Sequence, residues 1–569
     1  MSKQREKIDQ NQPHQDKESG TVATAAGIAA LGAGAVLMAT GCGGGGGGGD
    51  DSSPVGTTSP PPGGTTSGGT SGSTGIGIPA SFTVIDPVTR IEGHLKVAVE
   101  IDTVNGVQQV TDARCTGTLF RGFEQILAGR DPRDAPYLTE RICGVCPVSH
   151  GLAATMALED AAAVAVPANA RILRNLVLGA NFLQSHILHF YLLAALDYVN
   201  APPGAPWSPA WNIDLMRSGN LQRISSNLPA AITMRRKAHE MGAIFGGKMP
   251  HPSAFQAGGM TAKPTSSTIG AFTNYLDELA QFIDRVYIPD VQLLQSVYDE
   301  YSDIGKGHGH LMAYGVFDLD DRANPNRLLR RGVVNDSAPN SVQTLSTSNI
   351  REQVSFSWYA NSTDDRHPAG GSTVAVDPSA KPDAYSWLKA PRYDGKPMEC
   401  GPLARMWVNG DYWAGVSVMD RHMARALEAQ KIADAMFDWL DQLVVGNPVY
   451  NSYSSGFSQT GEGLTEAPRG ALGHWVSTAA SSTRSPTGGP AIGHYQIITP
   501  TCWNASPMDG NSMRGPIEEA LVGTPVQDAS QPVEVLRVIH SFDPCMSCAV
   551  HVMRPDGKPE VVAHAGVRG

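Results

Sequence analysis

The chain has 569 residues, of which 41% are hydrophobic and 17% are charged, and its formal net charge is −11. This length is enough to bury a large core, while the acidic balance argues against a nucleic-acid partner. Eight cysteines in so long a chain exclude a disulfide-stapled scaffold.

The N-terminal residues differ in composition from the rest. Residues 1–20 are polar and partly basic, residues 21–41 carry no charge, and Cys42 precedes a run of glycines. A charged lead, an apolar run and small residues before a cysteine are typical of an export signal or a membrane tether. A disordered tail or a misplaced start codon would explain the same composition. We expect a signal or tether at 1–42 and a disordered Gly/Ser/Thr/Pro linker at 43–80.

A β-hairpin is predicted near the start of the folded body, which we expect to run from 81 to 551. Hydrophobic residues occupy every second position of 95–101, and Asn105-Gly106 separates them from a second strand-like run at 107–115. Alternation on both sides of Asn-Gly is typical of a hairpin with a tight turn.

The rest of the body is predicted to be mainly helical. Helical patterns cover 148–164, 172–199, 268–301 with a break near Pro289, and 421–444. The apolar stretch 172–199 contains several Asn, Gln and His residues, so we predict a buried core helix and not a membrane span. Pro- and Gly-rich connections are expected at 320–400 and 445–500. The predicted fold class is mainly α with a small N-terminal β element (α+β).

Two Cys-x-x-Cys pairs, Cys143/Cys146 and Cys545/Cys548, are the main candidates for chemistry. Such a turn lets two sulfurs bind one metal, and sulfur ligands select zinc, copper(I), iron clusters or nickel. A structural zinc site is an equal alternative for the cysteines alone. However, zinc ribbons usually hold their pairs ~15–20 residues apart. A site that joins the two ends of the body favours a functional centre.

The chain resembles the large subunit of nickel–iron hydrogenases in several motifs. In chain order these are Arg90-Ile91-Glu92-Gly93-His94, Arg121-Gly122-Phe123-Glu124, Glu140-Arg141-Ile142-Cys143-Gly144-Val145-Cys146, Gly401-Pro402-Leu403-Ala404-Arg405, Ala467-Pro468-Arg469-Gly470-Ala471-Leu472 and Asp543-Pro544-Cys545-x-x-Cys548-x-x-His551. The resemblance covers about residues 81–569 and implies the family's large-subunit fold with a central helical bundle. Ser185 departs from the pattern, since many members of the family carry Asp there.

The resemblance implies a nickel–iron centre that cleaves dihydrogen heterolytically. Cys143 and Cys545 would be terminal nickel ligands, whereas Cys146 and Cys548 would bridge nickel to an iron that carries carbon monoxide and cyanide. Cys545 would take the proton and pass it to Glu92. Without the resemblance, Glu92 would be interpreted as a salt-bridge partner of the arginine two residues before it.

Further residues acquire roles from the same resemblance. Arg469 would lie over the iron and donate to a cyanide nitrogen, Asp543 would neighbour that arginine, and His150 would lie close to a bridging sulfur. Taken alone, Arg469 would be interpreted as an ordinary structural arginine and His150 as a core histidine with its hydrogen bonds satisfied. A magnesium or similar ion would be bound by Glu124, His551 and the backbone carbonyl near Ile497, with waters completing the octahedron. The alternative for Glu124 is a salt bridge with the arginine three residues before it.

The resemblance also implies partners and processing. Electrons would leave through an iron–sulfur small subunit, and from it to a membrane acceptor. A maturation endopeptidase would remove residues 552–569 after nickel-insertion chaperones have loaded the site. We expect a periplasmic, membrane-associated uptake enzyme, with a cytoplasmic location as the alternative. Competing functions are a dihydrogen sensor, a complex I-type subunit and a structural zinc protein.

Overall fold

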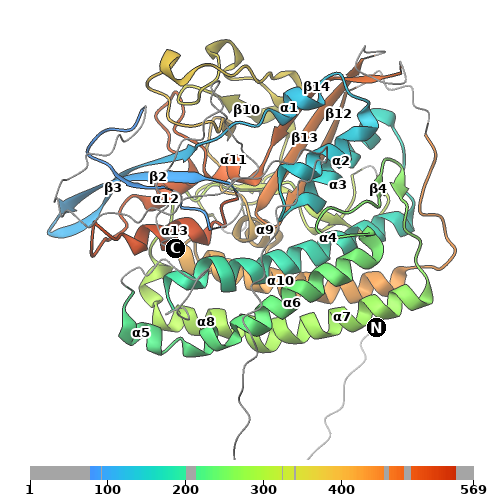
Figure 1. Ribbon diagram of the computed structural model, residues 1–569, viewed down its shortest axis with the longest axis horizontal. Helices are drawn as coiled ribbons and strands as arrows, with labels where there is room; N and C mark the ends of the chain where they lie inside the picture. The colour runs from blue at the N-terminus through green and yellow to red at the C-terminus, as the bar shows by residue number, and fades with distance from the viewer. Residues whose placement is uncertain are drawn as a thin grey trace, which may run out of the picture. The chain divides into compact units, whose positions relative to one another are not determined.

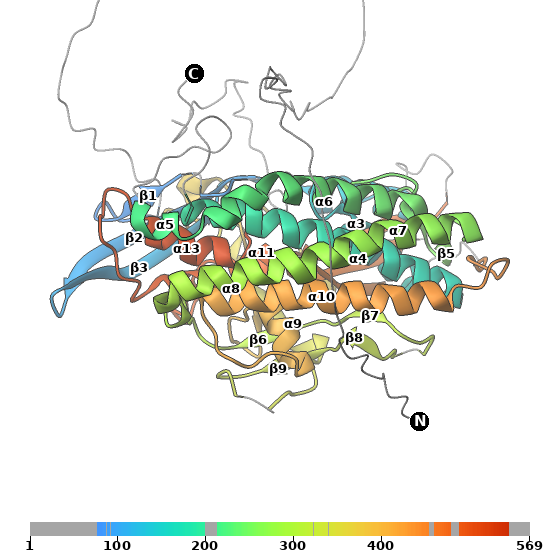
Figure 2. The same cartoon turned by 90° about the horizontal axis from the view of Figure 1, so that it is seen from below.

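Long helices lie side by side in the lower part of the computed structural model as drawn in Figure 1, and they face the viewer in Figure 2. They are α4 (Ala168–Leu188), α6 (Gln222–Gly246), α7 (Ser266–Phe282), α8 (Ile288–Val297) and α10 (Val418–Gln442). The structure describes residues 77–86, 88–90, 93–199, 213–322, 324–338, 341–453, 460–479 and 489–545. All of them belong to one compact unit, Ser71–Gly569. The predicted fold class, mainly helical with a central bundle, is confirmed.

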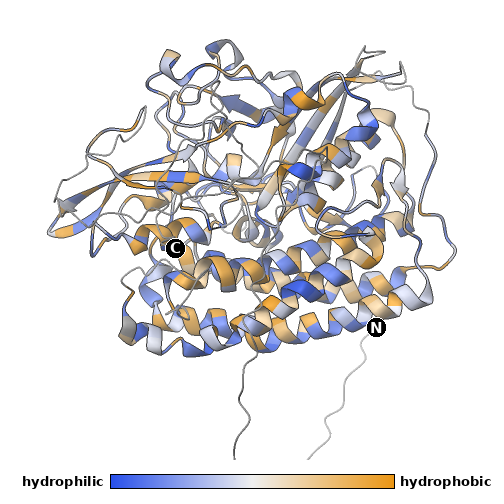
Figure 3. Ribbon diagram, viewed as in Figure 1, coloured by the Kyte–Doolittle hydropathy of each residue, from blue (hydrophilic) through white to orange (hydrophobic). Residues whose placement is uncertain are grey.

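The middle helix of this bundle, α4, is buried on nearly every side. The stretch Ala168–Asp197 is long and apolar enough to cross a membrane, but 94% of its most apolar window lies inside the molecule. This agrees with the prediction of a core helix. After α4 the chain continues through a wider π-helical segment, η3 (His189–Ala194), and then a tighter 3-10 turn, η4 (Ala195–Asp197). By contrast, α6 and α7 show hydrophilic and hydrophobic residues side by side in Figure 3, as helices with one buried face do.

The predicted N-terminal hairpin is confirmed. Strands β2 (Leu95–Val104) and β3 (Val107–Gly117) pair antiparallel, and β1 (Thr83–Ile85) adds to β2. Asn105 and Gly106 have positive φ angles of 52° and 82°. These left-handed conformations suit Asn and Gly, and they give the turn that joins two twisted strands tightly.

A second antiparallel sheet lies where the sequence predicted only a connection, so that prediction was wrong for 445–500. The sheet consists of β12 (Thr460–Ala467), β13 (Gly470–Ala479) and β14 (Ala491–Ile498). Glycines in β12 obscured the strand pattern, because glycine is uncommon inside strands. They are there because helix α3 (Pro147–Ala162) lies against the strand. A Cβ atom on Gly463 would be 1.9 Å from the carbonyl oxygen of Ala153.

The remaining helices and strands are short. The helices are α1 (Phe123–Leu127), α2 (Ala135–Thr139), α5 (Leu215–Gly219), α9 (Pro402–Asn409), α11 (Pro500–Asn504), α12 (Pro516–Leu521) and α13 (Val533–Ser541). The strands are β4 (Phe255–Gln256), β5 (Gly259–Met260), β6 (Leu311–Ala313), β7 (Val316–Asp318), β8 (Arg327–Leu329), β9 (Gly332–Val334), β10 (Ile350–Gln353) and β11 (Ala390–Tyr393). Several of these strands lie inside the connection predicted at 320–400.

The break expected near Pro289 takes a particular form. A π-helical segment, η5 (Ile283–Tyr287), joins α7 to α8, and Pro289 lies in the first turn of α8. The helical path therefore continues past the proline, which is tolerated there because the first amide groups of a helix have no intrahelical partner.

Candidate metal centre

Cysteines from opposite ends of the body meet in a buried cluster. The Sγ atoms of Cys143, Cys146 and Cys545 lie within 4.8 Å of one another, and those of Cys143 and Cys545 are 3.3 Å apart. Two sulfurs that each lie ~2.3 Å from one metal ion are at most about 4.6 Å apart. A disulfide would require roughly 2.05 Å. The spacing of Cys143 and Cys545 therefore fits two ligands of one metal. Cys548 lies outside the described residues.

The Cys143 turn is held by its own backbone and by α4. The N–H groups of Val145 and Cys146 both donate to Cys143 Sγ, at 3.3 Å each. The side-chain amides of Asn181 and Gln184 both donate to the carbonyl oxygen of Val145, at 3.0 Å each. The polar residues that interrupt the apolar pattern of α4 thus fix the first cysteine pair.

Cys545 is placed by the end of α13. The chain turns at Asp543, whose φ angle of 57° is left-handed, a conformation that Asp tolerates better than most residues. The Cys545 N–H then donates to Thr501 Oγ1 at 3.1 Å. All three described thiols are 1% exposed, so a metal bound by them would be shielded from solvent.

Arg469 reaches this cluster from the tip of a hairpin. Ala467 pairs with Gly470, so only Pro468 and Arg469 form the turn between β12 and β13. Arg469 Nε lies 3.1 Å from Asp543 Oδ1, and both side chains are 1% exposed. Burial opposes the guanidinium charge, but Asp543 and the thiols outweigh it and raise the pKa of Arg469 above its usual value. The arginine is therefore a permanent cation beside the sulfurs.

The guanidinium of Arg469 has unused donors. Although Asp543 is close, no nitrogen of Arg469 and no carboxylate oxygen of Asp543 has a hydrogen bond of good geometry to another described residue. Buried polar groups normally have partners. The donor set thus fits a nickel–iron centre: soft sulfurs suit nickel and iron, and free N–H groups suit an anionic ligand on the metal.

His150 lies in a buried chain of polar side chains. Its Nδ1 is 3.1 Å from His474 Nε2, and His474 Nδ1 is 2.8 Å from the Tyr495 hydroxyl. Burial, aided by Arg121, lowers the pKa of His150 to about 3, so the ring is neutral at pH 7. His150 is four residues beyond Cys146 in helix α3, which puts it on the same side of that helix.

The segment that contains Glu92 is anchored by a buried carboxylate. Glu92 itself lies outside the described residues. Arg90 donates to one oxygen of Asp197, and His540 Nδ1 lies 2.6 Å from the other. His540 Nε2 is 3.0 Å from the carbonyl oxygen of Val88. Arg90 is thus paired with Asp197. Asp197 connects the start of the body to α13, which leads to Cys545.

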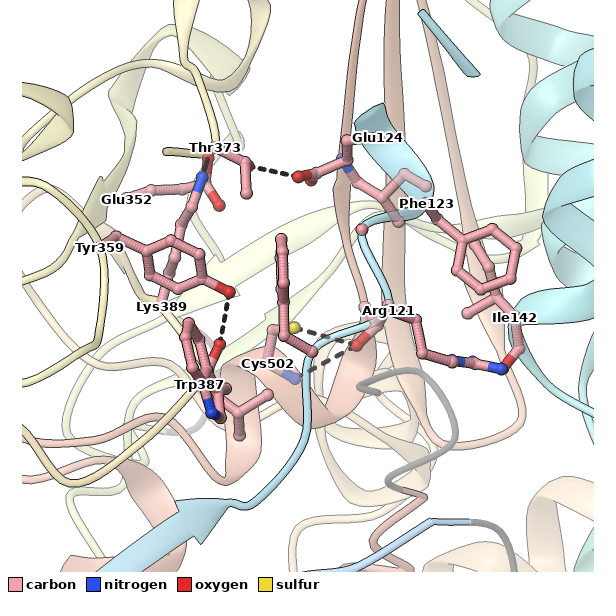
Figure 4. Close-up of a pocket in the computed structure, with 15 residues that line it drawn as sticks. Arg121, Phe123, Glu124, Ile142, Glu352, Tyr359, Thr373, Trp387, Lys389 and Cys502 are labelled. Carbon is pink, nitrogen blue, oxygen red and sulfur yellow. Dashed lines mark hydrogen bonds and ion pairs between the residues drawn. The ribbon is translucent and has the colours of Figure 1, made fainter. Parts of the chain in front are cut away.

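Two of the predicted magnesium-binding residues, Glu124 and Ile497, line a small cavity of about 90 Å³, shown in Figure 4. Glu124 accepts hydrogen bonds from the Ile497 N–H, at 3.1 Å, and from the Thr373 hydroxyl. Ile497 contacts Glu124 through its N–H group, whereas the prediction concerned its carbonyl. Since one water occupies roughly 30 Å³, the cavity has room for an ion with a few waters. His551 lies outside the described residues.

Sequence reasoning missed other charged groups around this cavity. Glu352 Oε2 is 3.3 Å from Lys389 Nζ and 2.9 Å from Gln496 Nε2. Burial, together with Glu124, raises the pKa of Glu352 against the effect of Lys389. With Arg121, which also lines the cavity, two carboxylates face two cationic side chains, so it is the carboxylate oxygens, and not a net negative charge, that suit a divalent cation. Glu352 lies in β10 and Lys389 directly precedes β11, but neither belongs to a motif whose spacing pointed to it.

Two models of protein families match the chain, and together their matches cover most of residues 83–551. A family model described as nickel-dependent hydrogenase matches residues 121–218, 207–415 and 409–551, and one described as HoxL-like matches residues 83–114.

Among curated relatives, the chain is 40% identical over 518 residues to the periplasmic [NiFeSe] hydrogenase large subunit of Desulfomicrobium baculatum, covering 84% of this chain and 96% of that protein. It is 33% identical over 585 residues to the uptake hydrogenase large subunit of Rhizobium leguminosarum bv. viciae, with the same two coverages of 84% and 96%.

Solved structures give the same result. The H2-activated [NiFeSe]-hydrogenase of Dm. baculatum superposes with a TM-score of 0.77 at 41% identity, covering 83% of this chain and 99% of that chain. The reduced Ni-Fe-Se hydrogenase of D. vulgaris Hildenborough gives a TM-score of 0.76 at 39% identity, covering 83% and 99%.

Proposed function

Because the chain belongs to the nickel-dependent hydrogenase family, we propose that it is the catalytic large subunit of a nickel–iron uptake hydrogenase. As a member of that family it is an oxidoreductase that acts on dihydrogen. The observation that carries the finer proposal is the buried cluster of Cys143, Cys146 and Cys545 beside Arg469, whose N–H groups make no hydrogen bond of good geometry to a described residue.

The metal would be held by the two cysteine pairs. Cys143 and Cys545 would be terminal nickel ligands, and Cys146 and Cys548 would bridge nickel to iron carrying carbon monoxide and cyanide. When bound, the centre supplies the two-electron chemistry of heterolytic dihydrogen cleavage. The names of some relatives include selenium, whereas all four candidate ligands here are cysteines. We therefore assign a nickel–iron centre without selenium.

The chain's own residues would handle the proton and the surrounding charge. Cys545 Sγ would accept the proton and Glu92 would receive it, since a carboxylate in a dry site suits a relay near neutral pH. Arg469 would donate to a cyanide nitrogen through its fixed fork, with Asp543 balancing its charge at 3.1 Å. His150, neutral and buried, would contact the sulfur of Cys146 without adding charge.

A second metal would stabilise the same region. Glu124 and His551 would bind magnesium or a similar ion together with the carbonyl near Ile497. Waters would complete the shell, as magnesium prefers. The cavity of about 90 Å³ beside Glu124 supports this assignment.

Electrons require a partner. Among the described residues, Cys115, Cys400 and Cys502 lie outside the ligand cluster, so an iron–sulfur small subunit would carry the electrons to a membrane acceptor. We assign residues 81–551 to the catalytic body, 1–42 to a signal or tether, 43–80 to a linker and 552–569 to a tail. Nickel-insertion chaperones and an endopeptidase would act on the precursor. We assign a periplasmic, membrane-associated location; the name of the Dm. baculatum relative supports the periplasmic part of this assignment.

Infrared spectroscopy tests this proposal most directly. The full chain would be purified with its partner, and spectra would be recorded in the carbon monoxide and cyanide stretching region. We expect such bands, about one nickel and one iron per chain, and hydrogen-dependent dye reduction. Zinc as the sole metal, with no such bands, would refute the proposal.

A further inference from the structure

The hairpin tip that carries Arg469 is buried, which is unusual for a two-residue turn. Turns normally lie at the surface, where water satisfies their backbone groups. Here Ala467 and Arg469 are buried. The carbonyl groups of this tip therefore need donors from the protein, because an unpaired buried carbonyl is costly.

Arg405, in helix α9, supplies those donors. Its Nη1 donates to the carbonyl oxygen of Ala467 at 3.0 Å, and its Nη2 donates to that of Pro468 at 2.8 Å. These are the two carbonyl groups that immediately precede Arg469 in the chain. The direction in which Arg469 leaves the backbone is thus set by contacts to Arg405.

Arg405 is itself fixed through every N–H group it has. Glu428 accepts from Nε at 2.6 Å and from Nη2 at 2.7 Å, and Glu466 accepts from Nη1 at 2.9 Å. With the two carbonyls, all five donors of the guanidinium are used. The side chains of Arg405, Glu428 and Glu466 are all 0% exposed.

The surrounding groups hold this arrangement in place. His186 Nε2 lies 2.8 Å from Glu428 Oε2, and the Arg405 guanidinium lies 5.1 Å from the centre of the Phe182 ring. Glu466 Oε1 accepts from the Tyr314 N–H at 2.6 Å. A lysine could not reproduce these contacts, because its ammonium has three donors and no planar fork.

We propose that Arg405 is a positioning residue for Arg469: through the carbonyl groups of Ala467 and Pro468 it fixes the turn that aims the Arg469 guanidinium at the metal ligands. This inference rests on the proposed function of Arg469. It assigns no contact between Arg405 and the metals, dihydrogen or the proton. Replacing Arg405 must therefore change the same readouts as replacing Arg469, namely the cyanide stretching frequencies and kcat.

Arg392 in β11 provides a matched control. It is 0% exposed, and its Nε pairs with Asp509 at 2.6 Å. Its other nitrogens donate to Ser506 and to the carbonyl groups of Pro391, Pro507 and Met513. Replacing Arg392 by lysine removes an equally buried and equally saturated guanidinium, but none of its partners belongs to the turn of Arg469.

The experiment compares R405K, R469K and R392K in the full chain purified with its partner. The readouts are metal content, the cyanide stretching frequencies and the steady-state constants for dihydrogen. We expect R405K to keep its nickel and iron, to shift and broaden the cyanide bands in the direction seen for R469K, and to lower kcat about ten- to a hundred-fold. R392K should lower thermal stability but leave the bands at wild-type positions.

Each outcome decides the proposal. Unchanged bands in R405K, with shifted bands in R469K, would overturn it. An equal shift in R392K would also overturn it, because loss of any buried arginine would then explain the change. If R405K gives no soluble complex, E428Q tests the same idea, because it weakens the two hydrogen bonds that Glu428 accepts from Arg405. Wild-type cyanide bands in E428Q would then overturn the proposal. Absence of cyanide bands from the wild type would instead refute the proposed function.

Discussion

Cys143 and Cys545 are 402 positions apart in the sequence, yet their Sγ atoms lie 3.3 Å apart. The first follows the N-terminal sheet and the second follows α13, so the body has to be nearly complete before both are in place. A metal bound between them would couple its binding free energy to folding of the whole body.

Loss of either thiol should abolish metal binding. We expect C143S and C545S to lose nickel and dihydrogen-dependent dye reduction, because a hydroxyl is a poor ligand for a soft metal. C115A is the matched control, since Cys115 is equally buried but lies outside the cluster, and it should keep both. Metal analysis of the purified complexes checks this, and a wild-type nickel content in C545S would contradict it.

Replacing Arg469 should slow turnover more than it weakens metal binding. Its guanidinium has no hydrogen-bond partner among the described residues, so R469K should fold with its metals in place. Removal of a preorganised donor typically costs ~10²–10³ in kcat. We expect a fall of that size with nickel and iron retained. A kcat within about two-fold of wild type would show that the guanidinium does not act on the reaction.

The cavity beside Glu124 should bind magnesium. A ligand that binds only the folded protein raises the free energy of unfolding by ~2.7 kcal/mol at a hundred times its Kd. We expect added magnesium to raise the melting temperature of chelator-treated wild type and not that of E124Q. E240Q, which changes a half-exposed glutamate paired with Arg236, should respond as the wild type does. An equal rise in E124Q would exclude Glu124 as a ligand.

Asp197 should make the protein sensitive to acid. Burial alone would raise the pKa of Asp197, but Arg90 and His540 outweigh it and lower the pKa to about 2. The unfolded value is about 3.9. A carboxyl with a depressed folded pKa contributes stability above its unfolded pKa, and this contribution is lost as pH falls from about 4 towards 2. Its size at neutral pH is about 2–3 kcal/mol.

Urea unfolding of D197N measures this contribution. The variant should be ~3–5 kcal/mol less stable than wild type at pH 7, because Arg90 and His540 lose their partner, and the difference should shrink near pH 3. D303N is the control, since Asp303 is 84% exposed in its pair with Lys306. A difference that is independent of pH would mean that charge pairing is not the cause.

Active protein should end at His551. The proposed endopeptidase removes residues 552–569 once the metal has been inserted, so intact-mass analysis of active enzyme should give a chain without them. Active enzyme that still carries Val552 to Gly569 would contradict this processing.

The sequence predicted those features that have a local signature. Asn105-Gly106 specified the hairpin, and the buried polar residues of α4 distinguished a core helix from a membrane span. The cysteine pairs were found from their Cys-x-x-Cys spacing and Arg469 from the resemblance of its motif to a known family, and the structure brings Cys143, Cys146, Cys545 and Arg469 together.

Features that depend on packing between distant segments could not be predicted. The β12–β14 sheet was missed because the glycines of β12 are required by its close packing against helix α3, and they interrupt the alternation that identifies a strand. Glu352 and Lys389 belong to no recognised motif, and only the folded chain shows that both line the cavity. Arg405 was noted as part of a motif, but its role depends on carbonyl groups of another element.

The glycines of β12 leave no clearance between that strand and helix α3. A Cβ on Gly461 would be 2.2 Å from the carbonyl oxygen of Ala157, and one on Gly463 would be 1.9 Å from that of Ala153. We therefore expect α3, which starts directly after Cys146, and β12, which leads to Arg469, to move as one unit. Their amides should exchange hydrogen in step, and thermal motion should carry sulfur and guanidinium together without changing the gap between them.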